Sequence, residues 1–180
     1  MPGPYRNLTD IPQFTRSGRY SVNTSWRYLE STLSEFAAGY GLDLDPDFQR
    51  GHVWTEAQQT RYVEFILRGG KTGRELLFNK HGWGGRTDDT SPLVLVDGKQ
   101  RLEAVRRFLR NEITAFGSLL REYGDNLNVV AHSFIFTVND LATRAEVLQW
   151  YLDLNSGGTI HSDDEIARVR ALLAAEQPAG

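Results

Sequence analysis

The segment from Leu93 to Leu109 constrains the fold of this chain more than any other part of the sequence. It begins with four consecutive apolar residues, Leu93 to Val96, which are typical of a buried strand. The polar turn Asp97-Gly98-Lys99-Gln100 comes next, and apolar residues then recur at helical spacing. The segment therefore predicts a strand, a turn and a helix in succession, and such turns are common places for ligand sites. The helix presents these residues on one side: Leu102, Val105, Phe108 and Leu109.

The spacing of apolar residues predicts the remaining elements. From Val22 to Tyr40 they step by three and four, which predicts one amphipathic helix closed by Gly39 or Gly41. Thr55-Glu56-Ala57-Gln58 is a capping-box pattern, so a helix should run from there to Arg68. Further strands are expected at Leu42–Asp45, Glu75–Phe78, Ile113–Phe116 and Phe134–Val138. Two more helices are expected, one capped by Asn139 and ending near Asn155–Gly158, and one beginning at the capping box Ser162–Glu165.

The composition narrows the possible functions. Twenty Lys and Arg face 23 Asp and Glu, and the net charge of −3 argues against a dedicated, charge-driven nucleic-acid binder. The absence of cysteine excludes thiol catalysis and thiolate metal sites. The histidines show no ligand spacing for a zinc or HNH-type site. They are His52, His81, His132 and His161.

The length of 180 residues predicts one compact domain. We expect an extended arm over residues 1–20, a single domain over residues 21–175 and a tail over residues 176–180. The longest apolar run is far shorter than the roughly 20 residues needed to cross a bilayer. We therefore expect a soluble, unexported protein without a membrane partner.

The turn after the central strand is the strongest candidate site. Asp97-Gly98-Lys99-Gln100-Arg101 places an acid, two cations and an amide at a helix start, whose dipole contributes about 0.3 to 1 kcal/mol to binding a nearby anion. Gly98 would let a ligand approach the backbone, and Lys99 and Arg101 would bind phosphate oxygens. Asp97 would hold a hydrated Mg²⁺ or position a water. The same residues equally fit a helix capped by Asp97 with two solvated cations.

Three other clusters carry possible chemistry. Phe48-Gln49-Arg50 with Trp54 offers Arg50 as an anion-binding fork, although composition slightly favours a surface arginine beside buried aromatic residues. The bend Leu154–Gly158 is by itself most often a helix stop. A basic stretch on one helix, diluted by acidic neighbours, could follow a nucleic-acid backbone. Its arginines are Arg106, Arg107 and Arg110, next to Lys99 and Arg101.

Taken together and in order, these motifs resemble the DGQQR-motif domain at the N-terminus of GmrSD-type modification-dependent restriction enzymes, within the ParB/sulfiredoxin-like superfamily. Asp47-Phe48-Gln49-Arg50 with Trp54 resembles the P-x-x-Q-R-x-x-x-W entry of the family. Val96–Leu102 resembles V-D-G-Q-Q-R-L, and Asn155–Gly158 resembles the late I-N-x-G-G element. The resemblance covers about residues 33 to 173.

The resemblance implies an α+β fold, namely a small mixed sheet flanked by helices with a helical C-terminal part. It also implies nucleoside-triphosphate binding and hydrolysis coupled to DNA recognition or cleavage. Lys99 stands where the family has glutamine, which would strengthen a nucleotide contact or alter hydrolysis. By position, the nucleotide site would comprise Gln49, Arg50, Asp97, Gly98, Lys99, Gln100, Arg101 and Asn155.

The leading hypothesis is a nucleotide-binding module with slow, Mg²⁺-dependent hydrolysis in a cytoplasmic DNA-directed system of bacterial or phage-infected cells. Restriction, phage counter-defence and partition are the systems it would serve, with DNA and a nuclease or other defence protein as partners. The candidate catalytic residues are Asp97, Arg101 and Arg50. A non-catalytic DNA-binding or protein-interaction module remains the alternative, and a ParB-like nuclease is the weaker one. HNH cleavage and sulfiredoxin chemistry are not expected, because their histidine cluster and cysteine are missing.

Overall fold

A computed structural model describes residue 11 and residues 20–49, 54–83, 90–156 and 163–176 of the chain. Most of the predicted arm and of the predicted tail therefore lies outside the described residues. No helix within the described ranges combines the length and apolarity needed to cross a membrane.

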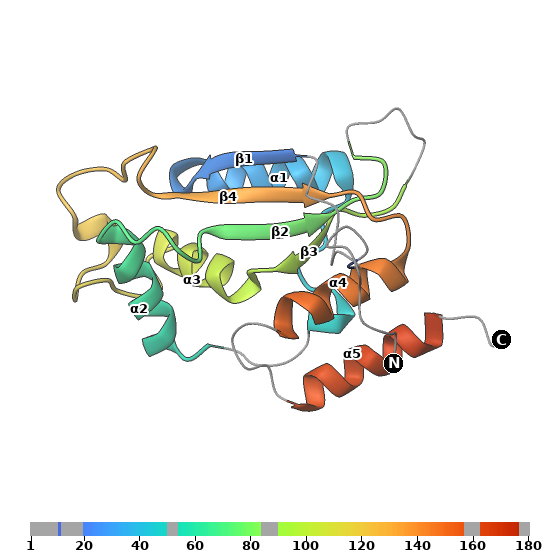
Figure 1. Cartoon of the computed structure of the whole chain (residues 1–180). Helices are drawn as coiled ribbons and strands as arrows, with labels where there is room; N and C mark the ends of the chain where they lie inside the picture. The colour runs from blue at the N-terminus through green and yellow to red at the C-terminus, as the bar shows by residue number, and fades with distance from the viewer. Residues whose placement is uncertain (1–10, 12–19, 50–53, 84–89, 157–162, 177–180) are drawn as a thin grey trace.

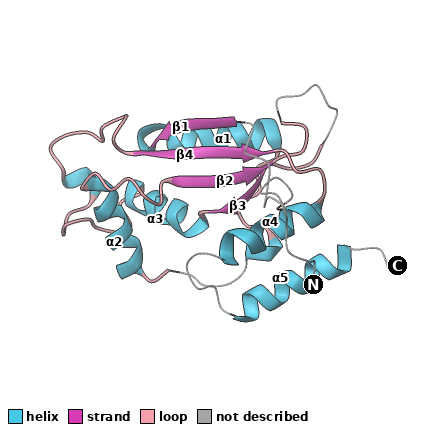
Figure 2. Cartoon of the chain, viewed as in Figure 1, coloured by secondary structure: helices cyan, strands magenta, loops and turns pink. Residues whose placement is uncertain are grey.

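The centre of the fold is a four-stranded mixed sheet in the order β1-β4-β2-β3 (Figure 2). Strand β4 pairs antiparallel with β1 and parallel with β2, and β2 pairs antiparallel with β3. The sheet is flanked by helices, so the predicted α+β class is confirmed. The strands are β1 (Tyr20–Ser25), β2 (Glu75–Asn79), β3 (Val94–Asp97) and β4 (Ser133–Asn139).

Helices cover both faces of the sheet because the strand side chains alternate (Figure 1). In β2, Leu76 and Phe78 join the larger core with α1, α2 and α3, whereas Leu77 faces the smaller core with α4 and α5. The helices described are α1 (Leu29–Tyr40), α2 (Glu56–Leu67), α3 (Lys99–Leu109), α4 (Arg144–Ser156) and α5 (Asp163–Glu176). Three 3₁₀ turns accompany them: η2 (Trp26–Tyr28), η3 (Asp47–Gln49) and η4 (Leu120–Glu122).

Several local predictions are confirmed. The Thr55–Gln58 capping box opens α2, with the Thr55 N–H donating to Gln58 Oε1 at 2.8 Å. Gly41 ends α1 in the left-handed conformation, at a φ of 60°. The strands predicted at Glu75–Phe78 and Phe134–Val138 are β2 and β4, each within one residue of its predicted ends.

The helix predicted from Val22 is wrong in its first part. Residues 20 to 25 form β1, and the α-helix begins only at Leu29. The reason is a tertiary one: β4 supplies backbone partners along the whole of β1, from Tyr20 opposite Val138 to Ser25 opposite Ser133. A ladder with so distant a segment overrides the helical spacing of apolar residues.

Three further local predictions also need correction. Ile113–Phe116 is no strand, because Phe116 has a φ of 48° and only the isolated bridge between Ala115 and Ser118 forms there. Asn139 ends β4 instead of capping a helix, and Glu146 binds the N–H groups before α4. Leu42–Asp45 contributes a single bridge, from Asp43 to Val94. The predicted cap at Ser162 lies outside the described residues.

Candidate functional site

Gly98 lies at the turn between β3 and α3, and the neighbouring strand β2 requires a glycine there. Its φ is 103°, a conformation that favours glycine. A Cβ atom at this position would lie 2.3 Å from Leu76 Cδ2 and 3.4 Å from the carbonyl oxygen of Glu75. The sequence predicted that Gly98 lets a ligand approach the backbone closely. The structure shows instead that strand β2 lies close to Gly98.

The start of α3 carries no side-chain cap. Gly98 occupies the N-cap position, and no side chain among the described residues caps the first N–H groups of the helix. The interpretation of Asp97 as the helix cap is therefore wrong. As far as the described part of the chain shows, the first turn of α3 keeps the free donors and partial positive charge that attract anions.

Both cations of the turn are paired with aspartates. Arg101 Nη2 lies 2.5 Å from Asp97 Oδ2 and donates to the carbonyl oxygen of Glu75 at 3.1 Å. Lys99 Nζ pairs with Asp45, which precedes η3. The Asp97 side chain is about one third exposed and the Arg101 side chain about one quarter. An anion from solvent can therefore reach this part of the turn.

Two glutamines fasten the segment before α2 to the turn. Gln49 Nε2 donates to the carbonyl oxygen of Leu95, at 2.9 Å, and to that of Val96. Gln100 Oε1 accepts a hydrogen bond of 2.9 Å from the backbone N–H of Trp54. The predicted anion-binding residue Arg50 follows Gln49 in the sequence and lies outside the described residues.

Two buried polar atoms near the turn lack hydrogen-bond partners among the described residues. They are Gln49 Oε1, an acceptor, and Arg101 Nε, a donor. Buried polar groups without partners are rare in folded proteins and indicate a missing partner such as a ligand or water. Both belong to residues that the sequence assigned to the nucleotide site.

Tyr62 of α2 lies beside Arg101. A Cβ added at Gly73 would lie 3.6 Å from Tyr62 Cε2 and 3.7 Å from Arg101 Cδ. The hydroxyl of Tyr62 donates to the carbonyl oxygen of Gly73 at 2.7 Å. Burial raises the pKa of Tyr62, and the charges of Arg101 and Arg74 only partly oppose this effect. The phenol is therefore neutral at physiological pH and acts as a hydrogen-bond donor.

Asn155 is grouped with the C-terminal helices. Its Nδ2 donates to the carbonyl oxygen of Tyr151, one turn earlier in α4, at 2.6 Å. It also lines a groove of about 320 Å³ between α4 and α5, together with Ile166 and Arg170. The predicted role of Asn155 in closing the nucleotide site stays a prediction, because neither observation joins it to the turn.

The arginines of the predicted basic stretch are paired with carboxylates. Arg106 donates to both oxygens of Glu30, at 2.7 and 3.0 Å. Arg107 pairs with Glu56 at 3.0 Å. Arg110 pairs with Glu112 at 2.6 Å and with Glu103 at 2.9 Å. This side of α3 is therefore electrically balanced, which does not favour contact with a nucleic-acid backbone.

No cluster of three or more histidine and carboxylate side chains suited to a metal ion forms within the described ranges. A magnesium ion at the turn would therefore depend on few protein ligands. A site with few protein ligands is common for Mg²⁺, which usually binds one or two carboxylates together with substrate phosphates and water. Asp97 is the carboxylate that the sequence assigned to this role.

Sequence reasoning missed two partners of the turn, Asp45 and Glu75. Asp45 was assigned only to a short strand, and Glu75 contributes a backbone carbonyl that no residue pattern marks. The negative charge of Asp45 was the one signal that it could pair with Lys99. Several other aspartates carry the same charge, so this signal could not identify Asp45.

The chain was compared with protein-family models, curated proteins and solved structures, and none of the three comparisons gave a match.

Proposed function

We propose that this protein is a nucleotide-binding module that hydrolyses nucleoside triphosphates with Mg²⁺. It would act in the cytoplasm of a bacterial or phage-infected cell, in a DNA-directed system such as restriction, counter-defence or partition. Its partners would be DNA and a nuclease or other defence protein. The main support is the start of α3, where uncapped helix amides, Lys99 and Arg101 occupy one turn.

Binding of phosphate at this turn would proceed by exchange of ion pairs. Phosphate oxygens would replace Asp97 and Asp45 as the partners of Arg101 and Lys99, because a polyanion carries more charge than one carboxylate. The Arg101 Nε–H and the first amides of α3 would supply further donors. The exchange would free the two carboxylates, and Asp97 would then hold the metal or orient a water.

The metal would supply charge neutralisation on the phosphate oxygens, as in other phosphoryl-transfer sites. Gln49 and Gln100 would act by fixing the segment that contains Arg50. From that segment Arg50 would offset the charge that grows on the leaving oxygens. The neutral phenol of Tyr62, which lies near Arg101, would help to position that side chain.

A titration of the full chain with ATP, GTP and CTP, with and without Mg²⁺, tests this function. We expect a nucleotide-dependent rise in melting temperature and release of inorganic phosphate. Arg101→Ala should abolish both, and Arg101→Lys should retain part of the binding because it keeps the charge. Arg61→Ala, an exposed arginine of α2, is the matched control and should behave as wild type.

The proposal is refuted if no nucleotide raises the melting temperature, no phosphate is released and Arg101→Ala is indistinguishable from wild type. A DNA-binding or interaction module without turnover is the alternative, and it gains no support from the paired arginines of α3. DNA affinity that falls steeply with salt and ignores nucleotide would favour that alternative. Nicking of supercoiled plasmid with Mg²⁺ or Mn²⁺ would favour a ParB-like nuclease.

A further inference from the structure

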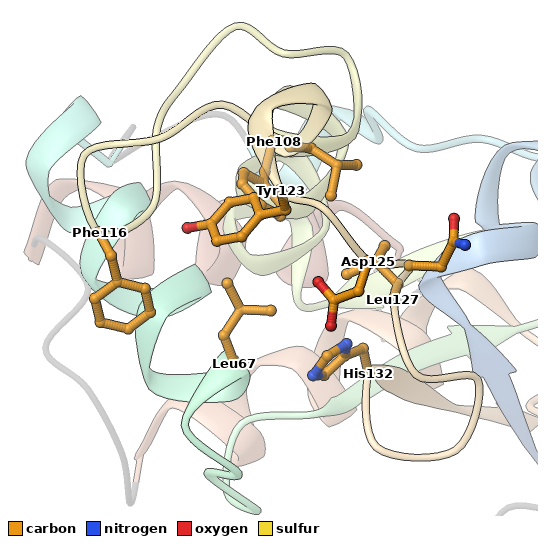
Figure 3. Close-up of a pocket in the computed structure, with 9 residues that line it drawn as sticks. Leu67, Phe108, Phe116, Tyr123, Asp125, Leu127 and His132 are labelled. Carbon is orange, nitrogen blue, oxygen red and sulfur yellow. The ribbon is translucent and has the colours of Figure 1, made fainter.

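A separate cavity lies at the opposite end of α3 from the turn. It has a volume of about 240 Å³ and opens beneath the connection between α3 and β4 (Figure 3). Leu67 at the end of α2 and Phe108 near the end of α3 form part of its wall, together with Leu127 of the connection. Most of its lining is apolar, so the cavity favours an apolar group over water.

Phe116 stands at one end of the cavity in a strained conformation. Its φ of 48° is costly for an aromatic residue, and the residue as a whole is nearly half exposed. Glu64 Oε1 accepts from the Phe116 N–H at 2.7 Å, and the Arg68 guanidinium lies 5.2 Å from the ring centroid. The fold therefore keeps the aromatic residue Phe116 partly exposed at the cavity, although burying it would cost less free energy.

Tyr123 forms a fixed aromatic wall between the two ends, as Figure 3 shows. Its hydroxyl donates to the carbonyl oxygen of Ala115 at 2.5 Å, which leaves the face of the ring for apolar contact. Because this hydrogen bond already orients the ring, a ligand would pay little entropy to order it.

The other end of the cavity is lined by a carboxylate, that of Asp125. Asp125 and His132 lie together there (Figure 3). His132 Nδ1 accepts a hydrogen bond from the Asn128 N–H at 3.1 Å, so the ring is in its neutral form. Burial and the nearby Arg74 lower the pKa of His132, while Asp125 acts in the opposite direction. Asp125 itself takes part in no ion pair within the described residues.

We infer that this cavity binds a small molecule with an aromatic or branched apolar body and one protonated amine, whose ammonium group pairs with the Asp125 carboxylate. The volume is sufficient, since a dry cavity of about 150 Å³ accommodates benzene. A single ring with a two-carbon amine chain therefore matches both the size and the charge of the site. The inference is independent of the nucleotide site, which lies at the other end of α3.

Phenethylamine is a suitable probe, and ethylbenzene is its neutral counterpart of similar shape. We expect chemical-shift changes of the amides around Phe116, Tyr123 and His132 on titration of the full chain with phenethylamine. Binding of ethylbenzene should be about fivefold weaker because it lacks the charge that pairs with Asp125.

Two variants separate the charge from the cavity. Asp125→Asn should weaken phenethylamine by about fivefold and leave ethylbenzene unchanged. Glu35→Gln on α1, an exposed carboxylate elsewhere, should change neither. Leu127→Phe should weaken both ligands by filling the cavity, with its fold checked by the unchanged amide spectrum of β4. The inference is overturned if phenethylamine causes no shifts at the cavity, if both probes bind equally, or if Asp125→Asn has no effect.

Discussion

Arg101 Nη2 lies 2.5 Å from Asp97 Oδ2, so the acid that ends β3 and the cation in the first turn of α3 neutralise each other. Lys99 and Asp45 repeat the arrangement beside them. An anion that enters the turn must therefore compete with two carboxylates. Anion binding should therefore become stronger when another group binds the two carboxylates. A divalent cation is such a group, because it binds carboxylates directly.

The first prediction concerns Asp97→Asn. Removing the charge frees Arg101, so nucleotide affinity without Mg²⁺ should rise several-fold, on the order of 1 kcal/mol for one partly exposed pair. The gain in affinity that Mg²⁺ gives the wild type should be lost, and phosphate release should fall at least about tenfold. Nucleotide titrations in Mg²⁺ and in chelator measure both effects. Full hydrolysis by the variant would show that Asp97 has no role in holding the metal.

The second prediction concerns Gly98→Ala. The positive φ costs about 1 to 2 kcal/mol and the overlap with Leu76 about 1 to 3 kcal/mol more. Gly117→Ala is the matched control, because Gly117 also has a positive φ, of 82°, but no atom lies within 4 Å of its Cβ position. Urea denaturation should show the larger loss of unfolding free energy for Gly98→Ala. Equal losses would mean that the β2 contact is easily relieved.

The third prediction concerns the anchor between Gln100 and Trp54. Gln100→Ala removes the acceptor of the Trp54 N–H and should cost about 1 kcal/mol of stability. Hydrogen exchange of the Trp54 amide should become faster, by the factor that corresponds to this loss of free energy. Gln100→Glu keeps an oxygen at this position and should preserve the slow exchange. If the alanine variant exchanges as slowly as wild type, the amide is protected by some other group.

The fourth prediction concerns the pH dependence of stability. Because burial and Arg74 lower the pKa of His132, the folded protein resists protonation of a ring that the unfolded chain protonates near pH 6.5. The stability contribution of the neutral ring is therefore present above about pH 6.5 and is lost as the pH falls below it. Wild type should lose more unfolding free energy between pH 7.5 and 5.5 than His132→Gln.

Urea denaturation of both proteins at the two pH values makes this comparison, and titrating groups that do not interact with His132 cancel in the difference. The groups that face His132 are Arg74, Asp125, Asn128 and Trp26. An identical pH response of the variant would assign the acid sensitivity to the carboxylates alone.

The parts of the fold that depend on neighbours in the chain could be predicted from the sequence. The succession of β3, turn and α3 is one such part, and the capping box of α2 is another. Strand β1 could not be predicted, since it forms only because Ser133–Asn139 pairs with it from more than a hundred residues away. Phe116 had the β-propensity of a strand, but the tight turn at Ala115–Ser118 uses it in the left-handed conformation.

The sequence places five of the candidate residues next to one another, but it does not predict which partners they contact. Asp97, Gly98, Lys99, Gln100 and Arg101 do share one turn, and Gln49 reaches it. The pairing of Lys99 with Asp45 and the demand of Leu76 for a glycine at position 98 depend on tertiary packing. The sequence shows which charged residues are present, whereas the fold determines which oppositely charged residue each one pairs with.

The order of the strands in the sheet has a consequence for how the chain is made. Strand β4 lies between β1 and β2, although it follows both in the sequence. A ribosome that has released residues 20 to 110 has therefore produced both flanks of the sheet without the strand that joins them. Until β4 emerges, the backbone hydrogen-bonding groups of β1 and of the open edge of β2 have no partners. A nascent chain stalled before Ser133 should therefore recruit chaperones or aggregate. A chain stalled well after Asn139 should do neither.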